Sequence, residues 1–267
     1  MKRLPNTTKN CHYVSQFFLR FHAFNGTGNI LRLKRDELKV RPKSINAVCS
    51  EDDYFNFVHD GVINTALEGM ISKWEAKYSP GIKRLVKDLE SRNIADAASE
   101  MLQEDVEYIR RGENVPRMDD MISLSAYSSM LLTFSPRWRK AKGITSSVAD
   151  ATRVEDLISV VEDTIHATQI DAFKPIFFVL PENSPTRLIT SDHPFRISES
   201  TSYLALTPRI LVGLIDSGQL ETPYHVTECS DNMARNVNYD TAKTCNEYIL
   251  GSQKDIILEA SKVWNDM

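Results

Sequence analysis

The strongest constraint on the fold is a change in the spacing of apolar residues near Pro175. Between residues 62 and 172, apolar side chains recur every three or four positions, which is the period of a helix with one buried face. From Pro175 onward, short runs rich in β-branched and aromatic residues predict strands instead. No internal repeat is present, so the sequence predicts a helix-rich α+β protein.

The pattern can be divided into elements by its period and by its Gly and Pro residues. The predicted helices cover residues 12–24, 62–78, 80–90, 94–111, 119–134, 153–172, 231–247 and 254–264. Pro80 is expected to end one helix and to begin the next. The predicted strands or extended segments cover residues 30–34, 44–49, 175–180, 187–190, 203–206 and 210–215.

Strands at both ends of the chain flank a helical middle. We therefore expect one α+β domain over residues 11–267, preceded by a flexible tail over residues 1–10. Its small antiparallel sheet is expected to come mainly from the C-terminal half, with an N-terminal strand or hairpin added. The two ends of the chain are then expected to meet in the fold.

Composition excludes some classes of protein. Hydrophobic residues make up 42% and charged residues 25% of the chain, as in globular proteins. The net charge of −4 argues against a chain-wide affinity for nucleic acid or anionic lipid, but allows a local basic patch. No secretory signal or membrane-length apolar run is present, so we expect a cytoplasmic protein without a membrane partner. Four scattered cysteines predict free thiols.

The stretch from His12 to Arg20 has a polar edge and an apolar stripe. His12, Gln16 and Arg20 are spaced four residues apart, so a helix would place them on one edge, away from the apolar stripe formed by Val14, Phe17, Phe18 and Phe21. Such an edge can bind an anion, position water or orient a carboxylate. The alternative is a surface edge, or a buried network that ties this helix to the sheet.

The same stretch, HYVSQFFLRFHAF, resembles the HYVPQFYLRNF-type opening of a large, mainly bacterial family of proteins of unknown function. Later segments resemble this family in the same order: WEAK at 74–77 before Pro80, SPRWR at 135–139, ITSDHP at 189–194, LTP at 206–208, and Asn236 and Asn238 in the last long helix. Ser15 stands where the family has proline, and His193 where it has asparagine. The resemblance spans residues 12–251 and implies no particular activity.

Two carboxylates are candidate reacting groups. Glu75 follows Trp74, and an apolar setting raises the pKa of a carboxyl group toward the range useful for acid–base catalysis. The alternative is an exposed charge paired with Lys77 or with the next helix. Asp192 follows a predicted strand, where it could hold a metal, orient His12 or pair with Arg20. The alternative for Asp192 is a turn residue that caps backbone amides.

The densest basic cluster contains Arg137, Arg139, Lys140 and Lys142. Arginines can grip phosphate by two-pronged contacts, and a base could stack on Trp138. The alternative is a solvated surface. The usual motifs of dinucleotide-binding proteins, P-loop proteins, zincin proteases and α/β-hydrolases are absent, which excludes the commonest forms of those classes.

Two functions therefore stay open. In the first, the chain is a hydrolase of a phosphate-containing substrate, either a nuclease or a nucleotide hydrolase. His12, Glu75 and Asp192 would act as acid–base groups or hold a divalent metal, and the substrate would be bound by Gln16, Arg20, Arg137, Arg139 and Asn236. In the second, the chain is a non-catalytic partner of another protein, for example in a bacterial or phage defence or toxin–antitoxin locus. Convergence of the polar residues in one cleft would distinguish the two.

Overall fold

The computed structural model describes most of the chain. The described residues are 2–3, 9–24, 28–37, 39–59, 62–91, 105, 107, 110–111, 117–136, 140, 148–150, 159, 173–197, 202–216, 218 and 222–266. The predicted helix at 153–172 and most of the one at 94–111 lie outside them. The described elements confirm the helix-rich α+β class.

The helices and strands run in the following order. The helices are α1 (Gln16–Phe21), α2 (Ala66–Glu90), α4 (Met118–Thr133), α7 (Asp231–Thr244) and α8 (Lys254–Ser261), with 3-10 helices η1 (Ile45–Ala47) and η4 (Lys262–Asp266). The strands are β1 (Lys2–Arg3), β2 (Asn10–His12), β3 (Asn29–Lys34), β4 (Arg41–Ser44), β5 (Ser50–Asp52), β6 (Asn56–His59), β7 (Val62–Asn64), β8 (Val148–Asp150), β9 (Phe173–Val179), β10 (Thr190–Ser191), β11 (Phe195–Ile197), β12 (Ser202–Ala205), β13 (Ile210–Asp216), β14 (His225–Glu228) and β15 (Tyr248–Gly251).

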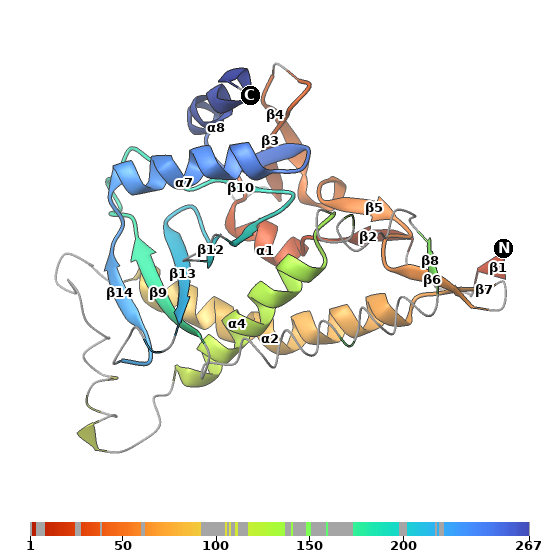
Figure 1. Cartoon of the computed structure of the whole chain (residues 1–267), viewed down its shortest axis with the longest axis horizontal. Coiled ribbons are helices and arrows are strands. Elements are labelled where there is room, and N and C mark those ends of the chain that lie inside the picture. Colours follow the sequence, from red (N-terminus) through yellow and green to blue (C-terminus); the bar gives the residue numbers. More distant parts are fainter. Residues whose placement is uncertain are drawn as a thin grey trace.

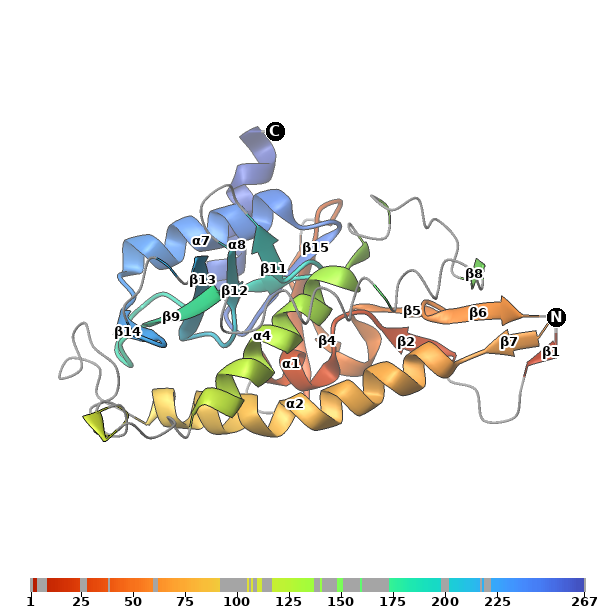
Figure 2. The ribbon, with the colours of Figure 1, turned by 60° about the horizontal axis from the view of Figure 1, so that its bottom comes forward.

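The largest sheet is built from the C-terminal half, as predicted. Its strand order is β11-β12-β13-β9-β14, with antiparallel neighbours except for β14, which pairs in parallel with β9. Side chains alternate between its faces. Phe177 joins the core shared with α2 and α4, while the next residue, Phe178, packs with Ala234 of α7. The sheet therefore lies between α2 and α4 on one side and α7 on the other (Figures 1 and 2).

A second sheet joins the two ends of the chain. Its order is β10-β15-β3-β4, and β3 pairs antiparallel with β15 so that Leu33 lies opposite Ile249. Both residues belong to an apolar cluster that α7 and α8 complete. The expected meeting of the N- and C-terminal parts is therefore present in the fold. Strand β1 also pairs with β7, and the division into a tail and one domain stays a prediction.

Several predicted boundaries are wrong, each for a local reason. Pro80 lies inside α2 and does not break it, because the buried face continues past it through Ile82 and Leu85. Residues 62–64 form strand β7, and the helix begins only at Ala66. The extended segment predicted at 44–49 is largely η1. The predicted helix at 231–247 ends at Thr244, because the chain turns at Cys245 to enter β15.

No helix in the described part of the chain is both long and apolar enough to cross a membrane.

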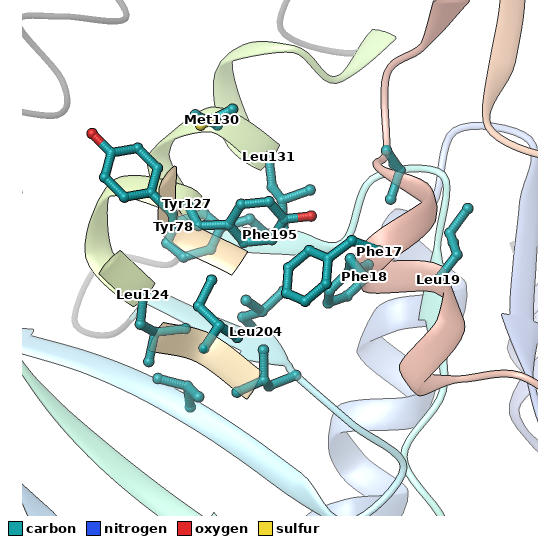
Figure 3. Packing of buried hydrophobic residues seen from close by; sticks show 14 of the residues in the cluster. Phe17, Phe18, Leu19, Tyr78, Leu124, Tyr127, Met130, Leu131, Phe195 and Leu204 are labelled. Atoms are coloured by element: carbon teal, nitrogen blue, oxygen red, sulfur yellow. The ribbon is translucent and has the colours of Figure 1, made fainter. Parts of the chain in front are cut away.

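Helix α1 is anchored in the main core by aromatic side chains. Phe18 is fully buried, and the ring of Phe17 meets that of Tyr127 edge to face, with 5.3 Å between centroids. Figure 3 shows Phe17 and Phe18 directed from α1 toward Leu124 and Tyr127 of α4. This packing fixes the position of a helix only six residues long, which has little intrinsic stability.

We predict that Phe18→Ala lowers the free energy of unfolding by about 3–5 kcal/mol, because it removes a buried ring and leaves a cavity. Ile122→Ala is the control, since Ile122 on α4 is exposed, and it should change stability by less than about 0.5 kcal/mol. Denaturant unfolding measures both. Equal effects of the two substitutions would contradict this role of Phe18.

Candidate functional site

Ser15 sets the start of α1. It has extended backbone angles (φ −64°, ψ 145°), and its Oγ accepts a hydrogen bond from the Phe18 backbone N–H at 3.4 Å. These are the features of an N-cap residue. The helix therefore begins at Gln16, and the prediction of a helix from His12 is wrong because His12 is the last residue of β2.

The polar edge nevertheless exists. Gln16 Nε2 lies 3.5 Å from His12 Nε2, at the limit of a hydrogen bond, and Arg20 Nη2 donates to Gln16 Oε1 at 3.1 Å. Gln16 is therefore placed between the imidazole and the guanidinium, although a strand and a helix supply them. His12 and Gln16 are partly buried and Arg20 is exposed, so the edge reaches solvent at Arg20.

Glu75 faces this edge from α2. Burial raises the pKa of Glu75 to about 7, and the negative charge of Glu68 contributes to this rise. A hydrogen bond with Ser15 and the positive charge of Arg20 oppose the rise. Glu68 lies two helical turns earlier on the same side of α2, and burial raises its pKa as well. A carboxyl group with a pKa near neutrality can both give and take a proton at physiological pH.

The Ser15 hydroxyl connects three elements. It is hydrogen-bonded to the Tyr127 hydroxyl of α4 as well as to Glu75 of α2. Tyr127 is fully buried, and burial raises its pKa well above the ordinary value, so it keeps its proton. When Glu75 is ionised, Ser15 gives its one proton to Glu75, so Tyr127 donates to Ser15. The hydrogen bonds thus run from Tyr127 through Ser15 to Glu75.

His12 is neutral at pH 7. Burial lowers its pKa below the ordinary 6.5, and hydrogen bonding with the backbone of Ile45 and Asn46 opposes this shift in part. A neutral imidazole has one nitrogen able to accept a proton. The edge therefore combines a base, a carboxyl group that titrates near neutrality and an exposed cation.

Asp192 has a different environment. It is completely buried, and its carboxylate oxygens accept backbone N–H groups of Asn246 at 2.9 Å and Glu247 at 2.6 Å. Burial raises the pKa of Asp192 to about 6, although these amide bonds oppose the rise. Asp192 thereby ties the end of β10 to the turn between α7 and β15. No described hydrogen bond or ion pair joins it to His12 or Arg20.

A metal held by His12, Glu75 and Asp192 does not fit this geometry. Among the residues that the structure describes, no group of three His, Cys, Asp or Glu side chains is placed to hold a metal ion. Asp192 also has its oxygens occupied by backbone amides. Its contacts are those of a residue that caps backbone amides, but its partners are distant in sequence.

The comparison with known families agrees with the resemblance seen in the sequence. Residues 10–255 match the model of a family described as a protein of unknown function, DUF4238. The chain belongs to this family. No curated protein and no solved structure matches the chain. The polar edge of α1, Glu75 and Asp192 all lie within the matched range of this DUF4238 protein.

The remaining predicted site residues are placed elsewhere or lie outside the described residues. Asn236 is exposed on α7. The buried asparagine of that helix is Asn238, which donates to the Arg187 carbonyl at 2.8 Å and accepts from the Ile189 N–H at 3.0 Å. Arg137 and Arg139 are outside the described residues. The structure therefore brings together His12, Gln16, Arg20 and Glu75, and places Asp192 and Asn236 apart from their hydrogen-bonded network.

Two residues of the site were missed in the sequence. Ser15 has a signal there, because a serine directly before an apolar helical pattern is a typical N-cap. Tyr127 has none, because its contact with Ser15 joins residues 112 positions apart. Only the packing of α4 against α1 reveals it.

We predict that Ser15→Ala destabilises the DUF4238 protein by about 2–3 kcal/mol, since it removes a helix cap and leaves the buried Tyr127 hydroxyl unpaired. It should also raise the pKa of Glu75 above 7, because the hydrogen bond that it removes favours the ionised form. Ser230→Ala is a matched control, because Ser230 caps α7 through Met233 alone, and should cost about 1 kcal/mol.

Denaturant unfolding and NMR titration of the Glu75 carboxyl carbon provide the measurements. An equal cost for the two serines, with an unchanged Glu75 pKa, would show that the Tyr127–Ser15–Glu75 connection contributes nothing.

We predict a pH-dependent stability from Asp192. Its folded-state pKa of about 6 exceeds the ordinary value of 3.8, so its stabilising contribution is present below about pH 4 and is lost as pH rises through about 6. The unfolding free energy of the parent, relative to Asp192→Asn, should therefore fall by about 3 kcal/mol over this window. Other titrating groups, including buried His22, are common to both proteins and cancel. A difference that rises with pH would contradict this prediction.

Proposed function

We propose that this DUF4238 protein is a cytoplasmic hydrolase of a phosphate-containing substrate that works by acid–base chemistry at the polar edge of α1. One observation carries the proposal. Glu75, hydrogen-bonded to Ser15, lies in the electrostatic range of Arg20, and Arg20 is exposed beside Gln16 and His12. Asp192, with its buried amide contacts, has a structural role in this scheme.

Protonation states support a division of roles. At a pH between the lowered pKa of His12 and the value of about 7 for Glu75, His12 is neutral and Glu75 is largely protonated. His12 then removes a proton from the attacking oxygen, and Glu75 gives one to the leaving oxygen. The new P–O bond forms as the bond to the leaving group breaks, and both side chains return to their initial states by exchanging protons with water.

The remaining groups position the phosphate. Arg20 offers donors for charge-assisted hydrogen bonds to phosphate oxygens, and such bonds stabilise the charge that develops in the transition state. Gln16 is hydrogen-bonded to Arg20, and its amide nitrogen lies at the maximum hydrogen-bonding distance from the His12 imidazole. Gln16 therefore fixes the position of the Arg20 guanidinium relative to the His12 imidazole. Tyr127 and Ser15 orient the carboxyl group of Glu75.

A second candidate function is a non-catalytic partner of another protein, for example in a bacterial or phage defence or toxin–antitoxin locus. It is favoured by the contacts of Asp192, which is used entirely within the fold. On this alternative, the polar edge of α1 is a network that holds β2, α1 and α2 together.

We predict that Glu75→Gln lowers kcat for a phosphodiester by about 10²–10⁴-fold, because the amide cannot donate the proton. Glu182→Gln is the control, since Glu182 is exposed in a turn, and should leave kcat unchanged. The assay uses bis(p-nitrophenyl) phosphate and short RNA and DNA oligonucleotides with EDTA present. The parent's rate should be bell-shaped in pH, falling as pH rises above about 7 when Glu75 ionises.

Loss of the parent's activity in EDTA would contradict acid–base catalysis and favour a metal. Full activity of Glu75→Gln would show that Glu75 is not the proton donor. A parent inactive on every substrate, with and without EDTA, would favour the binding alternative.

A further inference from the structure

The outward face of α2 carries a row of lysines. Lys73, Lys77 and Lys87 are all exposed. With 100° of rotation per residue, they fall within about 80° of one another around the helix axis. The buried side chains of α2, including Ile71, Ile82 and Leu89, lie on the opposite side. Figures 1 and 2 both show α2 along the outer edge of the molecule.

These lysines have no anionic partner in the part of the chain that the structure describes. No ion pair joins any described residue to Lys73, Lys77 or Lys87. The ammonium group of Lys77 contacts an aromatic ring instead, with Nζ 5.3 Å from the centroid of the Tyr78 ring. The neighbouring Arg84 is different, because Asp120 pairs with it at 2.5 Å. The row is therefore a local excess of positive charge on a chain whose net charge is −4.

Three of the four carboxylates of α2 do not offset this charge. Glu68 and Glu75 point toward β2 and α1, as their contacts with Cys11 and Ser15 indicate. Near the helix end, Asp88 is paired with Arg117. Glu90 is exposed one turn beyond Lys87 and accepts a hydrogen bond from Thr207, so it keeps its negative charge at that end of the row.

The row continues toward the candidate site. Lys83 is exposed on the flank of α2, and its Nζ lies 5.5 Å from the centroid of the Phe17 ring in α1. Arg20 is exposed one turn further along α1. Lys83 therefore lies between the lysine row and the polar edge that carries Arg20.

The dimensions and chemistry of this surface suit a nucleic-acid strand. The lysine row extends about 21 Å from Lys73 to Lys87, at 1.5 Å per residue. Trp74 lies about 100° from Lys73 around the helix axis and packs partly against the main core. Its exposed part provides a surface on which an unpaired base can stack. An anionic membrane would also require large apolar side chains among the lysines. Ser72, Ala76 and Pro80 occupy that face instead.

We propose that the outward face of α2, formed by Lys73, Lys77 and Lys87 with Lys83 and Trp74 on its two flanks, binds single-stranded nucleic acid and leads it to Arg20. The lysines contact phosphates, Trp74 stacks on a base, and Lys83 guides the strand to α1. This inference rests on the proposed function and gives it a substrate class.

The test measures binding of a fluorescein-labelled 12-nucleotide single-stranded RNA, of the same DNA sequence, and of vesicles containing 30% phosphatidylglycerol. Glu75→Gln in the full chain is the background, so cleavage does not deplete the strand. One variant replaces the four lysines of the surface by glutamine. The control variant replaces exposed Lys39, Lys243, Lys254 and Lys262 by glutamine. Both variants lose the same total charge, so only the position of the charge differs.

We expect the surface variant to bind the oligonucleotides at least about tenfold more weakly than the control. The slope of log K against log salt should be smaller by about 0.7 for each phosphate that the four lysines neutralise in the parent. Trp74→Leu should weaken binding without changing that slope, because stacking releases no counterions. RNA and DNA binding to similar extents supports recognition of the backbone, and a clear preference for RNA supports the surface with added recognition of the 2′-hydroxyl.

Equal binding by the surface and control variants overturns the proposal, as does binding to vesicles but not to oligonucleotides. Cleavage of a dinucleotide, which is too short to span α2, separates this inference from the proposed function. If the parent cleaves a dinucleotide but no strand binds α2, the surface is wrong and the hydrolase stands. If strands bind α2 but nothing is cleaved, the hydrolase is wrong and the surface stands.

Discussion

The hydroxyl group of Ser15 is the point at which three parts of the molecule are joined. It caps α1, contacts Tyr127 of α4 and contacts Glu75 of α2. Without this group, a helix of six residues would have neither a defined start nor a polar link to the two long helices. The aromatic packing of α1 fixes its depth in the core, while Ser15 fixes its direction. The placement of Gln16 and Arg20 follows from both.

The sequence was sufficient for elements whose own residues decide their structure. Helix α4 and strands β9 and β13 were predicted because their apolar pattern is regular over the whole length of the element. Prediction failed where contacts with residues distant in the sequence determine the local structure. Strand β15 follows α7 because β3 offers it an edge, and α2 passes through Pro80 because the core on its inner side is continuous. Neither partner is visible in the local sequence.

The candidate site divides in the same way. The four-residue spacing of His12, Gln16 and Arg20 predicted their proximity correctly, although on the wrong element, because Gln16 can reach back across the cap to His12. Glu75 could be recognised in the sequence as a candidate because it follows the apolar residue Trp74. Asp192 was ambiguous, because a turn aspartate that binds backbone amides and one that binds a ligand look the same in sequence. The lysine row of α2 is not among the predictions made from the sequence, because it is distinguished from other surface lysines only by its exposure and its lack of ion pairs.

The pairing of β3 with β15 determines when the folding of the protein can be completed. Residues more than 200 positions apart must meet before this sheet exists, and such non-local contacts make folding slow. During synthesis, β3 leaves the ribosome long before its partner, so its edge stays open until the last part of the chain has emerged. The polar edge of α1, which lies between β2 and β3, is held in a finished framework only then. A truncated or nascent chain would therefore carry the candidate site residues without the framework that arranges them.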